Sequence, residues 1–138
     1  MRGWFMDSLL QDLRALSQFD PRALYRVSTA SGEHFYAGHR GVDPRGLPDT
    51  PRVHLSVMPQ EQSALWTRGD GPNLVLHLMG WAALQNHRVR LEAVNEFDER
   101  GDHLVYEASL HAVDSVASAR AGDPLRALLR VLVRAHVG

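Results

Sequence analysis

The sequence predicts a single α+β domain over residues 1–138, in the order α-βββ-α-ββ-α, with an antiparallel sheet covered by helices on one face. Apolar residues recur at helical spacing near both ends and in the middle of the chain, and they alternate with polar residues in between. Clusters of Gly, Pro, Asp and Ser separate these segments. A chain of 138 residues buries roughly two thirds of its unfolded surface, so it folds without a metal or a disulfide.

The first half of the chain predicts one helix and three strands. The helix covers residues 5–16, where apolar side chains share one face, and Pro21 prevents its continuation. A hairpin follows, with strands over 24–29 and 34–37 that are rich in β-branched and aromatic residues. The connection over 38–51 holds too many Pro and Gly for regular structure and is the best candidate for a mobile segment.

A third strand and a second helix occupy the middle of the chain. Val53, Leu55 and Val57 alternate with polar residues, which predicts a strand with one buried face. The helix begins at Pro72 and is apolar almost all round as far as Asn86. Such a helix is normally buried on more than one side.

Residues 87–111 predict a long hairpin that turns between Asp98 and Gly101. In this register Phe97 faces Asp102, and the apolar residues of both strands fall on one face while the charges fall on the other. A polar linker over 113–123 follows. The last helix is capped by Asp123 and begins at Pro124.

Composition excludes several functional classes. The chain has no cysteine, which removes disulfides, thiolate nucleophiles and iron–sulfur ligation. Its net charge of −1 predicts no long-range attraction to nucleic acid or anionic lipid, although all fifteen basic residues are Arg. No apolar run is long enough to cross a bilayer, and the N-terminal residues make a poor signal peptide. We therefore expect a cytoplasmic protein.

One pair of acids has the arrangement that catalysis would need. Glu92 and Glu107 fall opposite or diagonal to each other on the polar face of the hairpin, where two carboxylates can raise one another's proton affinity. Arg88 and Arg90 share that face, so we expect ion pairing instead of turnover.

No motif predicts a catalytic residue, a cofactor or a metal. The chain has eight histidines, but an odd separation sends His34 and His39 to opposite faces of one extended segment, which is wrong for chelation. The glycine-rich motifs that bind nucleotides and the sequence motif of a serine hydrolase are also missing.

Three surfaces are candidates for binding. The first is a homodimer interface on the second helix and the hairpin, because aromatic residues are enriched where two surfaces exclude water. Its residues are His77, Trp81, Arg88, Arg90, Glu92 and Glu107. The second is a client-binding face on the first helix. Its residues are Trp4, Phe5, Leu9 and Leu13.

The third surface is a cationic stripe on the last helix, formed by Arg126, Arg130 and Arg134 at intervals of four residues. Such a stripe contacts nucleic-acid phosphates in some proteins. A solvated helical face explains the same spacing equally well.

The element order, with a helix that ends at Gln85-Asn86 before a long hairpin and an amphipathic helix that closes the chain, resembles the YbjN-like and type III secretion chaperone fold. The resemblance covers nearly the whole chain and concerns topology alone. It implies a small homodimer without enzymatic activity that holds an unknown partner polypeptide on its surface. This chain is less acidic than those chaperones typically are.

The resemblance leads us to expect a non-enzymatic, secretion-chaperone-like protein-binding module. The nearest rival is a roadblock-like regulatory scaffold, in which the third strand lies on the other side of the middle helix. A nucleic-acid-binding accessory protein and a small enzyme with no recognisable motif stay open as alternatives.

Overall fold

The computed structural model describes residues 3–57 and 70–137, with only the backbone for residues 3–8. It has the predicted α+β class. The helices are α1 (Gly3–Phe19), α2 (Gly71–Leu84) and α3 (Pro124–His136). The strands are β1 (Tyr25–Thr29), β2 (Gly32–Ala37), β3 (Val53–Val57), β4 (Arg88–Asp98), β5 (Gly101–His111) and β6 (Val116–Ala121).

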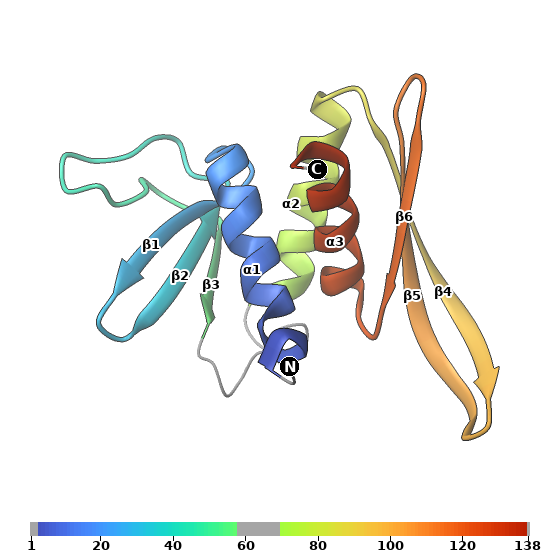
Figure 1. Ribbon diagram of the computed structural model, residues 1–138. Helices are drawn as coiled ribbons and strands as arrows, with labels where there is room; N and C mark the ends of the chain where they lie inside the picture. The colour runs from blue at the N-terminus through green and yellow to red at the C-terminus, as the bar shows by residue number, and fades with distance from the viewer. Residues whose placement is uncertain (1–2, 58–69, 138) are drawn as a thin grey trace.

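The described strands form two antiparallel sheets of three strands each. One has the order β1-β2-β3 and the other has the order β4-β5-β6. The three helices lie between the two sheets, so the molecule is layered as sheet, helices, sheet (Figure 1). The sequence predicted one sheet covered on one face. The strands before α2 and the strands after it instead make separate sheets, because α2 and its neighbours fill the space between them.

Strand β6 replaces the polar linker that the sequence predicted over 113–123. Its residues do alternate, with Ala117, Ala119 and Ala121 opposite the apolar side chains of β5. Alanine is a weak strand former and carries little apolar surface, so this alternation resembles a linker in the sequence. The extra strand widens the second sheet and brings Arg120 beside the hairpin.

Helix α3 is the central element of the core. It packs against β5 and β6 on one side and against α1 and α2 on the other. Asp123 accepts a hydrogen bond from the backbone N–H of Arg126 at 2.8 Å, and Pro124 opens the first turn, as predicted. Its buried residues are Pro124, Leu125, Ala127, Leu128, Leu129, Val131 and Leu132.

An ionic contact joins α1 to the first sheet. Glu33 of β2 accepts hydrogen bonds from the Nε of Arg14 at 3.0 Å and from the Nε of Arg26 at 2.5 Å. The Glu33 side chain is only 11% exposed. The Arg14 bond, and after it the bond and positive charge of Arg26, hold the pKa of Glu33 below its ordinary value, although burial acts in the opposite direction.

We expect Leu128→Ala to lower the free energy of unfolding by about 2–5 kcal/mol, because it leaves a cavity where α3 contacts both halves of the core. Leu128 is completely buried. Leu84→Ala is the matched control, since Leu84 is 83% exposed and its loss changes stability by less than about 0.5 kcal/mol. Urea denaturation measures both variants, and equal effects would contradict the assigned core.

We expect Glu33→Gln to destabilise the protein by about 1–2 kcal/mol at neutral pH. The lowered pKa means that this stabilisation is present above the ordinary carboxyl value of 4.5 and is lost as pH falls through the lower value in the folded protein. Denaturation curves of both proteins should therefore converge at acidic pH. A difference that persists unchanged in acid would show that the glutamine simply packs worse.

Candidate functional site

The hairpin of β4 and β5 has the register that the sequence predicts. Phe97 lies opposite Asp102, and Glu92 lies directly opposite Glu107. The turn holds because the side chain of Asp98 accepts a hydrogen bond from the backbone N–H of Arg100 at 2.8 Å. One face of the ribbon is therefore apolar and the other is ionic.

Ion pairs neutralise the carboxylates of the polar face. Arg120 of β6 donates to Glu107 at 2.9 Å and to Glu96 at 2.6 Å, and these bonds raise the pKa of Arg120. The Nε of Arg90 lies 3.5 Å from an oxygen of Glu92. The role of Arg120 was not predicted from the sequence, because the residues of β6 were predicted to be a polar linker. Two acids whose charges are already balanced on an open sheet face are poorly placed for proton transfer.

The apolar face of the hairpin is only half covered. Ala108 and Leu110 are buried against the core. Towards the tip, Leu104 is 56% exposed and Phe97 is 79% exposed. Figure 1 shows the β4–β5 ribbon extending past the ends of the helices. Large exposed apolar side chains that share one face are typical of an interaction surface.

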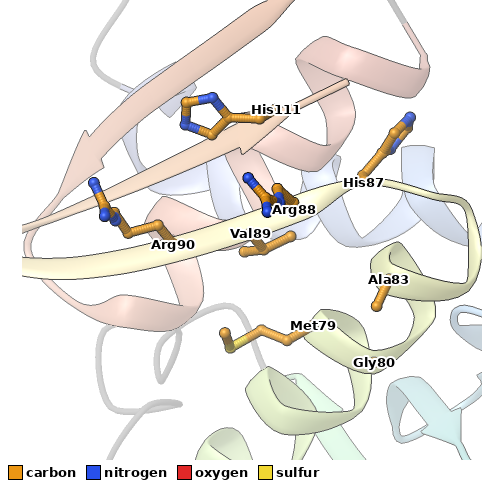
Figure 2. A pocket seen from close by; sticks show the side chains of 8 residues that line it. All are labelled: Met79, Gly80, Ala83, His87, Arg88, Val89, Arg90 and His111. Carbon is orange, nitrogen blue, oxygen red and sulfur yellow. The ribbon is translucent and has the colours of Figure 1, made fainter. Parts of the chain in front are cut away.

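A cleft of about 720 Å³ separates α2 from the beginning of β4. Figure 2 shows Val89 on the side of β4 that faces α2, across from Met79 and Ala83, whereas Arg88 and Arg90 lie on the other side. No carboxylate is among the residues that line it. These residues are Met79, Gly80, Ala83, His87, Arg88, Val89, Arg90 and His111.

A second cleft of about 520 Å³ runs along α2 on the other side of Gly80. It is lined by apolar residues that include Leu76 and Leu84, both largely exposed. Helix α2 therefore buries one face and leaves an apolar face open, whereas its all-round apolar pattern predicted burial on more than one side.

The proposed dimer residues separate into two groups. Arg88, Arg90 and Glu92 are exposed on the hairpin, and Glu107 is half-buried. Trp81 is instead buried, and its Nε1 donates to Asp20 at 2.9 Å. His77 is half-buried, with its Nε2 3.4 Å from the carbonyl oxygen of Arg22. Trp81 therefore anchors α2 to the end of α1.

The client-binding residues predicted on α1 do not share one exposed face. Leu9 and Leu13 are buried in the core, so their side chains stabilise the fold and are not accessible to a client. They turn inward because α1 packs against α3. The side chains of Trp4 and Phe5 lie outside the described part of the structure.

The arginines of α3 all have contacts within the chain. Arg126 lies 3.2 Å from Asp123, and Arg134 donates to the carbonyl oxygen of Ser118 at 2.9 Å. Arg130 and Arg134 also lie near Asp12, whose pKa is raised because burial outweighs their attraction. The arginines of this stripe therefore contact neighbouring parts of the same chain.

Histidines and aromatic rings cluster where α1, α2 and α3 end. His136 lies 4.7 Å from His87 and 5.0 Å from Trp81, measured between ring centroids. Burial, and after it the neighbouring His87, lowers the pKa of His136. Within residues 3–57 and 70–137, no group of three or more His, Asp or Glu residues is placed to hold a metal ion. His136 is far in sequence from Trp81 and His87, so no local spacing could have revealed the cluster.

No protein-family model, curated protein or solved structure matches this chain. Among the described helices, none has the length and apolar character needed to cross a membrane.

Proposed function

We propose that this chain is a non-enzymatic protein-binding module that works as a homodimer, and that two β4 strands pair to form it. The observation that carries the proposal is the edge of the second sheet. Strand β4 has 11 residues, and among the strands of residues 3–57 and 70–137 it is paired with β5 alone, along one side. A long unpaired edge is a template for another strand.

The charges of β4 are divided along its length. Its first half carries Arg88 and Arg90, and its second half carries Glu96 and Asp98 on the same face. An antiparallel pair of β4 strands therefore places the basic half of each copy against the acidic half of the other. Opposite charges across two strands stabilise their pairing, and like charges oppose it.

Full overlap of the two strands gives one favoured register. It is centred on Ala93, with Arg88 opposite Asp98 of the partner copy and Arg90 opposite Glu96 of the partner copy. A shift in one direction that keeps the faces aligned puts Glu92 opposite its own counterpart, and the opposite shift puts it across from Glu96. Both shifts oppose like charges, so electrostatics selects the register with the longest overlap.

The same register covers the exposed apolar tip of the hairpin. Phe97 falls opposite Val89 of the partner copy, beside the 720 Å³ cleft that Met79 and Ala83 also line. Phe97, a large apolar side chain that is 79% exposed in the monomer, thereby reaches an apolar cleft. Burying a phenylalanine contributes about 1.5–3 kcal/mol, and a two-fold dimer buries two.

The strands before α2 favour a chaperone-like module over a roadblock-like scaffold, whereas the three strands after α2 are the number that the roadblock-like order has. Strands β1, β2 and β3 all precede α2. The chaperone-like order has three strands there, whereas the roadblock-like order has two. In this proposal the dimer presents the first sheet and α1 of each copy outward, where a client polypeptide is held.

Two single variants, mixed together, test the register. We expect Arg88→Glu and Asp98→Arg each to weaken self-association by about tenfold or more, because each homodimer then holds two like-charge pairs. A mixture of the two variants restores an electrostatically matched heterodimer. Sedimentation velocity at several concentrations measures all three samples. If the mixture associates no better than the separate variants, the register is wrong, and a wild-type chain that stays monomeric refutes the dimer.

We also expect Phe97→Ser to weaken the dimer by about tenfold or more, because the apolar contact with the partner is lost. The variant should leave the free energy of unfolding of the monomer almost unchanged, since Phe97 is largely exposed in the monomer. Val113→Ser is the control, because Val113 is also exposed but lies beyond the end of β5. Equal dimerisation of the two variants and the wild type would contradict a role for the tip.

A further inference from the structure

A third cleft, of about 350 Å³, lies where the connection between β2 and β3 meets α2. Its lining contains two arginines and two histidines but no carboxylate among the described residues. The lining residues are Gly38, His39, Arg40, Thr50, Arg52 and His77.

Backbone hydrogen bonds hold this connection in a defined shape. The N–H of Arg40 donates to the carbonyl oxygen of Asp49 at 3.0 Å, and the N–H of Arg52 donates to that of Ala37 at 3.0 Å. Gly38 has a φ of +69° and sits so close to Arg52 that an added Cβ would lie 3.0 Å from the Arg52 Cβ. Both arginines therefore leave the backbone at fixed points beside the same cleft.

The positive charges of the cleft are not balanced from within the described chain. Arg40 and Arg52 make no ion pair with a carboxylate of residues 3–57 or 70–137. The nearby acid Asp43 is bound by Arg45 at 3.0 Å, and Asp49 does not line the cleft. Two unpaired guanidinium groups present planar donors that match the oxygens of an anion.

The histidines add an unsatisfied polar atom. The Nδ1 of His39 is buried and has no hydrogen-bond partner within residues 3–57 and 70–137, although such atoms are almost always paired. Its ring packs on Tyr25, with centroids 5.3 Å apart. Burial lowers the pKa of His39, and the adjacent His77 lowers it further.

We propose that this cleft binds a phosphate group, either as free phosphate or as the terminal phosphomonoester of a small molecule. Arg40 and Arg52 bind its oxygens through charge-assisted hydrogen bonds, and His39 of the same connection and His77 of α2 line the rest of the site. The cleft is formed by the 38–52 connection and α2 without β4, so a monomer binds as well as a dimer.

Isothermal titration of the full chain with inorganic phosphate and with glycerol 3-phosphate, at constant ionic strength, tests the site. We expect saturable binding that is weakened at least tenfold by Arg52→Gln and by Arg40→Gln. Arg45→Gln is the matched control, because Arg45 belongs to the same connection but pairs with Asp43 away from the cleft. Proton NMR of the His39 ring should show a shift on titration of the wild type and none in Arg52→Gln.

The two ligands distinguish the source of the phosphate. Equal affinity points to the free anion, and tighter binding of the ester points to a phosphorylated small molecule. The proposal is overturned if neither ligand saturates in the millimolar range, if chloride competes as well as phosphate does, or if Arg45→Gln weakens binding as much as Arg52→Gln. Sedimentation of the same variants distinguishes failure of the phosphate site from failure of the proposed dimer. Substitutions at Arg40 and Arg52 do not change β4, so these variants should associate as the wild type does.

Discussion

The apolar face of α3 is the contact on which the rest of the structure depends. It joins the second sheet to α1 and α2, and these two helices in turn support the first sheet. A helix of 13 residues spans about 20 Å, whereas strands of 11 residues span about 36 Å. One helix therefore cannot cover the whole hairpin. The exposed tip of the β4–β5 ribbon is a geometric consequence of this mismatch, and it leaves Phe97 79% exposed in the monomer.

The sequence predicted those features that depend on periodicity. Alternation and a two-residue turn placed Phe97 opposite Asp102, and Glu92 opposite or diagonal to Glu107, since a shift of one residue would have reversed the faces of the hairpin. It missed β6, because its inward positions are all alanine, and therefore missed Arg120. It also placed Leu9 and Leu13 on a surface, because an apolar stripe on a helix does not reveal whether another helix of the same chain covers it.

The clefts could not be predicted for a different reason. His39, Arg52 and His77 belong to separate segments, and only the packing of α2 beside the β2–β3 connection brings them together. No local spacing encodes such a cluster. Its one signal in the sequence is the exclusive use of Arg as the basic residue, which a GC-rich genome also explains. Residues whose chemistry depends on tertiary packing are therefore invisible to periodicity.

The arginines of the described chain divide into those that pair with an acid and those that do not. Acids are numerous enough to balance the basic residues, with 16 of the former and 15 of the latter. Arg14 and Arg26 share Glu33, and Arg120 bridges Glu96 and Glu107, so these side chains join neighbouring elements.

Arg40, Arg52 and Arg88 have no such acid in the described part of the chain, and each lies beside a cleft next to α2. Helix α2 has no charged residue, so it cannot supply counter-charges itself. The two clefts adjoin different positions on the helix, Met79 and Ala83 in one and His77 in the other. In these two proposals, a strand from a second copy and a small anion can therefore bind beside α2 at the same time. Only the first of these two sites requires the chain to associate.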